Sequence, residues 1–406
     1  MLEAVIDILK QNNCVGVAEA LPIKKARLNE NTLGFYIASV ELGADEFCPR
    51  GVFGTAFAAD IDPMSALTRA TFEAVERYFL AASGYSDWKT TFCDISDHKL
   101  FKYQSGSCSG YHYSNIVRAV IADNHLTGEK IFVPEGDMFA PYPEKNGNIG
   151  APSTTNGIAC HTDSKMAIRS AIFELYERHC IMDFWFIGQD FAKKIPCSYI
   201  RNINIKEFSI IESMGYSLTF VLISRCFFSP TILVLARHNI NTYPYAIFSA
   251  STKSTYIDAI TSALKELIQT IVSLVYSKDK FIKWQNIRRV TSLEHNMFHY
   301  ADPYLANTSG DLFEFIEKID DIDMDSISNA FSNSEIEPKV ADMDPFFDIG
   351  LSKTYALEIT PKIFRDEICV IRAVNDSAFK LVVGDTFGET RLLRSSTRIK
   401  HPHPFP

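Results

Sequence analysis

The sequence lacks paired cysteines. Its nine cysteines are scattered along the chain, and no two of them form a C-x-x-C pair. Disulfide frameworks and zinc ribbons are built from cysteines at close, repeated spacings, so neither is expected here. We therefore expect reduced thiols, which agrees with a cytoplasmic protein.

The chain also lacks a basic excess, a signal sequence and a long apolar run. It has 40 basic and 49 acidic residues and a net charge of -9, which does not favour a nucleic-acid partner. The first residues have neither the basic start nor the small-residue cleavage site of a signal peptide. The most apolar stretch, residues 218–235, contains Arg225 and Pro230 and is shorter than the ~20 residues that cross a bilayer. We expect a soluble protein.

Two common nucleotide-binding motifs are absent as well. Neither the P-loop G-x-x-x-x-G-K-[ST] nor the dinucleotide fingerprint G-x-G-x-x-G occurs. Any nucleotide site must therefore be built from other residues.

Hydrophobic residues make up 47% of the 406 residues, which is enough for a large core.

Hydrophobic patterning and capping residues predict mixed secondary structure. Long helices are expected at about 62–82, 163–186 and 256–276, and strands at 33–40, 116–122, 130–133, 219–223, 231–236 and 369–372. No long low-complexity linker separates domains. We predict an α+β fold with mixed sheets and one composite core, made of an N-terminal segment, residues 1–50, and a main domain, residues 51–406.

The three predicted helices repeat one local pattern. The segments read ALTRATFEAVER at residues 66–77, AIRSAIFELYER at residues 167–178 and AITSALKELIQ at residues 259–269. In each segment a glutamate lies four positions after the residue at Arg69, Ser170 or Ser262, and a second glutamate or a glutamine follows three positions later. A single E-x-x-E pair is most often a solvated helix face, but three copies are harder to explain in that way.

Convergence of the three helix faces would place five carboxylates in one site. They would need cations to remain ionised together. Mg²⁺ prefers such hard oxygen ligands and commonly binds together with nucleotide phosphates. The repeat therefore predicts a Mg-nucleotide site formed by Glu73, Glu76, Glu174, Glu177 and Glu266.

The motifs around these helices resemble the YcaO family. The run PSTTNGIA at residues 152–159 is similar to the family's T-[ST]-N-G-[LI]-A turn, and ELYER at residues 174–178 is similar to its E-x-x-E-R helix. The segment FEAVERY at residues 72–78 resembles the family's first motif helix. The final HPHPFP, residues 401–406, resembles the P-x-P-x-P end of the azoline-forming cyclodehydratase branch, of the stand-alone D-protein type. On composition alone, this proline-rich end would be a disordered tail.

The resemblance implies a YcaO-like fold in which three long helices line a nucleotide site. It also implies an enzyme that cyclises Cys, Ser or Thr of a ribosomal precursor peptide to a thiazoline or oxazoline, with ATP and Mg²⁺ as cofactors. The five glutamates would hold Mg²⁺. The cofactor-binding residues carried over from the family are Arg69, Glu73, Glu76, Asn156, Ser170, Glu174, Glu177, Arg178, Ser262, Glu266 and Gln269. The residues carried over as catalytic are His295, Pro402, Pro404 and Pro406.

The sequence departs from the family pattern at two places. Ala56-Phe57-Ala58 stands where a G-K-G-like turn is usual, and Arg69 stands in place of a serine. These departures leave two alternatives open besides the cyclodehydratase: a scaffold subunit that no longer uses nucleotide, and a YcaO enzyme that forms thioamides or amidines. The proline-rich end argues against the second of these.

The resemblance further implies partners. The length of the chain leaves no room for a leader-peptide-binding region of the fused family members, so a separate E1-like or leader-binding protein is expected. A flavin-dependent azoline dehydrogenase and a homodimer are further expectations of the family.

Overall fold

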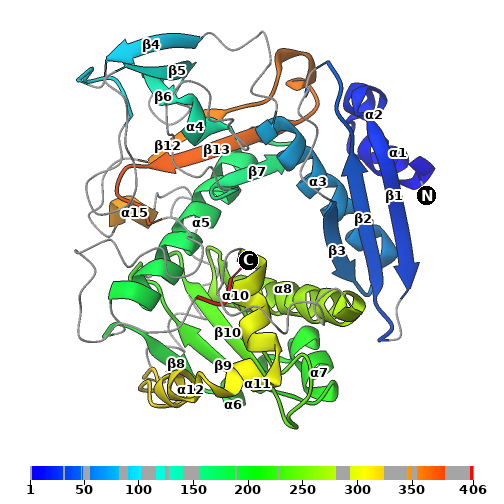
Figure 1. Cartoon of the computed structure of the whole chain (residues 1–406), viewed down its shortest axis with the longest axis vertical. Coiled ribbons are helices and arrows are strands. Elements are labelled where there is room, and N and C mark those ends of the chain that lie inside the picture. The colour runs from blue at the N-terminus through cyan, green and yellow to red at the C-terminus, as the bar shows by residue number, and fades with distance from the viewer. Residues whose placement is uncertain are drawn as a thin grey trace. The chain divides into compact units, whose positions relative to one another are not determined.

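The architecture was obtained as a computed structural model of the chain (Figure 1). The structure describes residues 2–30, 33–46, 48, 55–81, 90–94, 96–101, 116–123, 128–139, 155–187, 190–226, 228–279, 293–323, 345–348, 354–379 and 403–405. Groups of helices and groups of strands follow one another along these residues, and the chain forms two units. Unit 1 comprises Met1–Leu175 and Gly350–Ala378, and unit 2 comprises Tyr176–Ile349 and Phe379–Pro406.

Unit 1 contains three three-stranded antiparallel sheets and the helices between them. The first sheet has the order β1-β2-β3, the second β4-β5-β6 and the third β12-β13-β7. The strands are β1 (Ile23–Glu30), β2 (Tyr36–Leu42), β3 (Ala56–Asp60), β4 (Thr90–Asp94), β5 (Ile116–Asp123), β6 (Lys130–Pro134), β7 (Ile158–His161), β12 (Thr354–Glu358) and β13 (Cys369–Asn375). The helices are α1 (Leu2–Gln11), α2 (Val15–Ala20), α3 (Pro63–Ala81), α4 (Glu135–Met138) and the 3-10 helix η3 (Lys362–Phe364).

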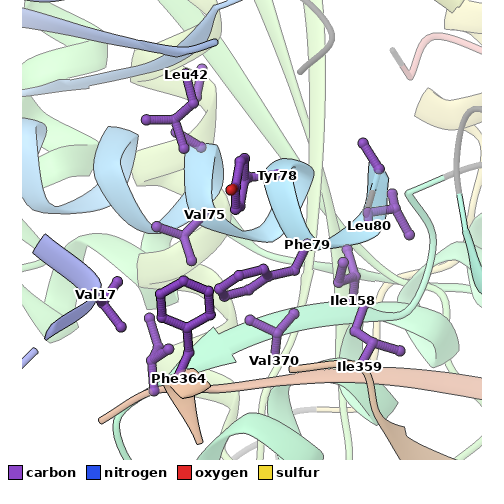
Figure 2. Close-up of a cluster of buried hydrophobic side chains, with 14 of the residues drawn as sticks. Val17, Leu42, Val75, Tyr78, Phe79, Leu80, Ile158, Ile359, Phe364 and Val370 are labelled. Carbon is purple, nitrogen blue, oxygen red and sulfur yellow. The ribbon is translucent and has the colours of Figure 1, made fainter. Parts of the chain in front are cut away.

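Helix α3 supplies much of the core of unit 1. Its buried face includes Val75 and Phe79, and Figure 2 shows these side chains directed toward Phe364 and toward Val370 of β13. The ring centroids of Phe79 and Phe364 lie 5.1 Å apart. Because aromatic side chains bury a large apolar area, this contact ties residues from both ends of the unit into one core. Glutamates on the remaining part of α3 lie outside this cluster.

Unit 2 is built on one four-stranded antiparallel sheet with the order β11-β10-β9-β8. The strands are β8 (Lys193–Ile195), β9 (Tyr216–Leu222), β10 (Thr231–His238) and β11 (Ala246–Thr252). The helices are α6 (Cys197–Ile203), α7 (Lys206–Ser213), α8 (Tyr256–Tyr276), α10 (Leu293–Ala301), α11 (Pro303–Asn307), α12 (Gly310–Glu317) and α15 (Pro345–Asp348). Helix α8 packs on β10 and β11.

Helix α5 (Ser164–Met182) contains the boundary between the units, at Leu175 and Tyr176. It continues directly into the π-helix η1 (Asp183–Ile187). Trp185 in η1 is fully buried in unit 2, where its ring centroid lies 6.1 Å from that of Phe248. The two E-x-x-E glutamates of α5 consequently belong to different units.

Each of the three long helices is capped by the side chain directly before it. A carboxylate oxygen of Asp62 accepts from the N–H of Ser65 at 2.6 Å, and one of Asp163 accepts from the N–H of Met166 at 2.9 Å. The hydroxyl of Thr255 accepts from the N–H of Asp258 at 3.1 Å. These bonds satisfy amides that a helix start leaves unpaired. They account for helix bounds close to the predicted ones.

The α+β prediction is confirmed, and the strands differ in detail. The strand expected at 33–40 begins at Tyr36, because Gly34 adopts a positive φ of 76° in the preceding turn. The residues 56–58, which depart from the family's G-K-G-like turn, form part of strand β3. Strands β7 and β11 were not predicted. Met64 in the first turn of α3 is 40% exposed.

Two expectations from composition can be compared with the structure. The eight cysteines that the structure describes are all free thiols. Among the described residues, only α8 is long and apolar enough to cross a bilayer, and half of the relevant stretch is buried. Because α8 packs on the sheet of unit 2, it is a core helix.

Candidate nucleotide and metal site

The repeated glutamates occupy equivalent positions in three strand–helix repeats. The repeats are β3 with α3, β7 with α5, and β11 with α8, and in each the helix starts shortly after the strand ends. Ten positions after the first residue of the helix stand Glu73, Glu174 and Glu266. Thirteen positions after it stand Glu76, Glu177 and Gln269. The repetition in the sequence is thus a repetition of structure.

Strand β7 binds one glutamate from each of two helices. The N–H of Cys160 donates to Oε1 of Glu76 on α3 at 2.8 Å, and the N–H of Ile158 donates to Oε2 of Glu174 on α5 at 2.9 Å. Backbone N–H groups two residues apart on a strand point to the same side. Since β7 is an edge strand of the described sheet, with β13 on its other side, the two carboxylates occupy the place of a further strand.

The other two sheets that precede a repeat helix show the same contact. Glu73 accepts a hydrogen bond from the backbone N–H of Phe57 in β3. Oε2 of Glu177 accepts from the N–H of Thr252 in β11 at 3.0 Å. Both strands are sheet edges within the described residues. The glutamates therefore make specific contacts with backbone groups and do not form a freely solvated helix face.

The N–H groups that bind the glutamates lie at fixed numbers of positions before the helix of their repeat. The first glutamate of a repeat binds the strand of its own repeat, six positions before the helix, at Phe57 or Ile158. The second glutamate binds the strand of the following repeat, four positions before the helix, at Cys160 or Thr252. Sequence analysis missed these residues because a backbone N–H is common to almost every residue type. The constant number of positions between each N–H group and the start of the helix is the sequence feature that would have located them.

The carboxylate of Glu76 is in an environment that disfavours its charge. Burial and the neighbouring carboxylate of Glu174 raise the pKa of Glu76 well above its ordinary value, and the hydrogen bond from Cys160 offsets only part of this. Burial also raises the pKa of Glu73, against the lowering effect of Arg77, which binds its Oε1. A cation placed between such carboxylates would keep them ionised.

The turn before β7 explains the N-G pair of the sequence motif. Gly157 has a positive φ of 71°, and a Cβ there would lie 2.7 Å from the carbonyl oxygen of Ala373 and 3.1 Å from Cβ of Leu175. Only glycine fits this conformation and this close approach. Asn156 beside it is 4% exposed, and its Nδ2 has no hydrogen-bond partner among the described residues. A buried amide donor of this kind suits a phosphate oxygen.

The other predicted cofactor residues are distributed over both units. The guanidinium of Arg69 donates to the carbonyl of Ala59 at 3.3 Å and lies 3.9 Å from Oδ2 of Asp60. Its positive charge is therefore paired with a carboxylate at the end of β3. Ser170 is exposed on α5. Half-buried residues in unit 2 are Arg178, Ser262, Glu266 and Gln269.

The structure brings Glu76 and Glu174 side by side, with Glu73 one helical turn before Glu76. Glu177 and Glu266 belong to unit 2, and a single site that joins all five glutamates stays a prediction. Within the part of the chain that the structure describes, no three His, Cys, Asp or Glu side chains are arranged as a ready metal site. The adjacent carboxylates and the buried Asn156 donor nevertheless fit a magnesium ion and a phosphate group in their chemistry.

The proline-rich end can be followed in part. His403 and Phe405 are buried in unit 2, at 0% and 1% exposure, and Pro404 between them is buried too. Nδ2 of Asn296 on α10 lies 3.2 Å from Nε2 of His403. This burial disagrees with a disordered tail.

The side chains of the remaining residues predicted to be catalytic are not among those that the structure describes. Pro402 and Pro406 lie outside the described residues. His295 falls in α10, but its side chain is not among those described. Their roles stay predictions.

Two side chains near the motifs lie in environments that disfavour their charged forms. Burial and the nearby Glu76 carboxylate raise the pKa of the Cys160 thiol well above its ordinary value, so the reactive thiolate is suppressed. Burial lowers the pKa of His179 to about 3. Its Nδ1 accepts from the N–H of Phe379 at 3.2 Å, and the two rings stack with centroids 5.1 Å apart.

Comparison with protein-family models finds the YcaO cyclodehydratase family, described as ATP- and Mg²⁺-binding, over residues 59–356. A comparison with curated protein sequences finds no match. Because the family match covers most of the chain, the protein belongs to the YcaO family. This confirms the predicted resemblance, and the family description agrees with the prediction of an ATP- and Mg²⁺-using enzyme.

Solved structures with the same fold include three informative examples. A heterocyclase in complex with substrate and cofactor has a TM-score of 0.66 at 10% identity; the match covers 93% of this chain but 52% of the heterocyclase. YcaO from Methanopyrus kandleri bound with AMPPCP and Mg²⁺ has a TM-score of 0.61 at 13% identity, with 95% and 94% of the two chains covered. The E. coli microcin synthetase McbBCD complex gives 0.59 at 13%, with 94% and 96% covered. This chain thus spans about half the length of the heterocyclase, and these likenesses establish the YcaO fold.

Proposed function

We propose that the protein is an ATP-dependent cyclodehydratase that converts Cys, Ser or Thr residues of a ribosomal precursor peptide into thiazolines or oxazolines. The observation that carries the proposal is the pair of carboxylates, Glu76 and Glu174, held side by side at the edge of β7. Such a pair stabilises the fold poorly by itself, because burial and mutual repulsion both disfavour its charge. Binding of Mg²⁺ together with a nucleotide would offset this repulsion and account for the pair.

The reaction requires the loss of an amide oxygen. A thiol or hydroxyl of the peptide attacks the preceding backbone carbonyl, the oxygen leaves as phosphate, and the backbone nitrogen loses its proton as the C=N bond of the ring forms. ATP supplies the phosphoryl group that makes this oxygen a leaving group. The protein's contribution is therefore positioning and charge neutralisation.

Named residues of this chain can take these roles. Glu73, Glu76 and Glu174 in unit 1, with Glu177 and Glu266 in unit 2, would hold Mg²⁺. Asn156 would donate its buried Nδ2 to a phosphate oxygen. The buried Pro404 and its neighbours would support the peptide site, as the family's proline-rich end implies.

A partner protein that captures the precursor is part of the proposal. Solved structures with this fold include the E. coli microcin synthetase McbBCD complex with pro-MccB17 bound, at 14% identity and a TM-score of 0.59. That assembly supports an E1-like or leader-binding partner for this chain. A flavin-dependent azoline dehydrogenase, a homodimer and a cytoplasmic location are further parts of the same proposal.

The test is ATP binding and ATP turnover by the purified full-length chain with Mg²⁺, with and without EDTA, in the wild type and in Glu174→Gln. Glu19→Gln on α2 is the control, because Glu19 is exposed and far in sequence from the motifs. We expect Mg²⁺-dependent binding and turnover that Glu174→Gln abolishes and Glu19→Gln retains. Turnover that survives in Glu174→Gln contradicts the metal site. No nucleotide binding by the folded wild type, with its partner present, favours the non-catalytic scaffold.

A further inference from the structure

Strand β7 is a common anchor for two helices. Among the described strands, it is the one seen to bind both a first glutamate, Glu174, and a second glutamate, Glu76. These residues come from different strand–helix repeats, so neither helix alone sets the distance between their carboxylates. The strand does, because the two N–H groups are two residues apart on one rigid backbone.

The need for such an anchor follows from the glutamate side chain. It has three rotatable torsions, so the position of its carboxylate is poorly fixed by the helix that carries it. A hydrogen bond from a strand N–H fixes one oxygen, and a carboxylate bound in this way keeps acceptor capacity on the other oxygen. Residues two apart on a strand are separated by about 6.6 Å. Two carboxylates fixed at that spacing are near enough to reach one cation between them.

We infer that β7 positions Glu76 and Glu174 for a shared divalent cation through the N–H groups of Cys160 and Ile158, which makes these two backbone groups positioning elements of the nucleotide site. This inference rests on the proposed function and adds to it the part of the chain that orients the ligands. Hydrogen-bonded partners behind metal ligands commonly set their geometry and affinity.

The same spacing between the N–H groups and the start of the helix extends the inference to the third repeat. Thr252, which binds Glu177, lies four positions before the start of α8, and Ala250 lies six positions before it. In the other two repeats, the first glutamate binds the N–H of the residue six positions before the helix. By this analogy we expect the N–H of Ala250 to orient Glu266.

The test removes the N–H of residue 160 and keeps a similar side chain. Cys160→Pro lacks the N–H, and Cys160→Ala is its reference because it removes the thiol but keeps the N–H. Proline is tolerated at an edge strand where the N–H points away from the sheet. Replacement of residue 160 by the α-hydroxy analogue of alanine removes the same N–H without restricting the backbone. Ile158→Pro with Ile158→Ala repeats the comparison at Glu174.

The measurement is ATP binding by calorimetry over a series of Mg²⁺ concentrations, with circular dichroism to verify folding. Relative to Cys160→Ala, both variants without the N–H should require about 10- to 100-fold more Mg²⁺ for half-maximal ATP binding. In a Glu76→Ala background, loss of the N–H should cost nothing further, because the two groups act together. A purely structural role would lower stability equally in both backgrounds.

The outcomes separate this inference from the proposed function. Equal Mg²⁺ requirements for the alanine variant and for the folded variants without the N–H overturn the role of β7 and leave the proposed function intact. Absence of Mg²⁺-dependent ATP binding in the wild type overturns both.

Discussion

The backbone N–H of Cys160 donates to Oε1 of Glu76 at 2.8 Å, although 84 positions separate the two residues in the sequence. Glu76 belongs to the first strand–helix repeat and Cys160 to the second. The position of this carboxylate therefore depends on the packing of one repeat against the next. Changes in β7, which itself contains no acidic residue, should affect the same function as changes in the glutamates themselves.

The turn before β7 should tolerate no side chain at Gly157. Gly157→Ala must place a Cβ at a positive φ and 2.7 Å from the carbonyl oxygen of Ala373, so something must shift. The unfavourable φ alone costs about 1–2 kcal/mol, and the overlap adds to it. We expect a clear fall in the free energy of unfolding, measured by denaturant titration.

Gly34→Ala is the matched control for this substitution. Gly34 has a similar positive φ of 76°, but a Cβ there meets nothing within 4 Å. It should show the cost of the backbone conformation without the overlap. Equal losses at the two positions would mean that the close approach to Ala373 is unimportant.

The stability of the protein should depend on pH through His179. Its pKa is lowered from 6.5 to about 3 in the folded state, first by burial and then by Arg225. Between these two values the unfolded chain binds a proton that the folded chain does not. The contribution is therefore present above pH 6.5 and is lost as the pH falls toward 3, with a slope of about 1.4 kcal/mol per pH unit.

His179→Asn should remove this slope. The asparagine oxygen can accept from the N–H of Phe379 in place of Nδ1 but has no proton to bind in this range. The free energy of unfolding should be measured between pH 4 and 7 in the wild type, in His179→Asn and in His98→Asn, whose side chain is 87% exposed. An unchanged slope in His179→Asn, or an equal change in His98→Asn, would show that His179 is not the group responsible.

The proline-rich end should contribute to stability as well as to catalysis. Phe405 is 1% exposed, and truncation of a buried phenylalanine to alanine typically costs about 3–5 kcal/mol. Phe405→Ala should therefore lower the thermal unfolding temperature markedly. Phe92→Ala, at a site 71% exposed, should change the free energy of unfolding by less than about 0.5 kcal/mol. If the two variants behave alike, the end of the chain is not packed in the core, and the disordered-tail interpretation returns.

The long helices were well predicted because their signals are local. The predicted 256–276 helix has the observed bounds of α8, and in the structure Asp62, Asp163 and Thr255, each directly before a long helix, act as caps. A cap bonds to an amide three positions away, so the sequence contains both partners within one turn. The repeated E-x-x-E spacing was visible for the same reason.

The edge strand β7 was not predicted, because it is short and its partner is remote. β7 has four residues and pairs with β13, more than 200 positions later in the chain. Its register is fixed by that pairing, which no pattern within residues 158–161 specifies.

By itself, the sequence determined which residues could carry the chemistry: five glutamates in a threefold repeat, an N-G turn and a proline-rich end, with no P-loop. Residue type and spacing along a helix are local properties, so they can be interpreted without the fold. Only the tertiary structure decided how these glutamates are oriented. The partners of Glu73, Glu76, Glu174 and Glu177 are backbone N–H groups of edge strands, which carry no residue identity and become available only once each sheet has formed and left one edge unpaired.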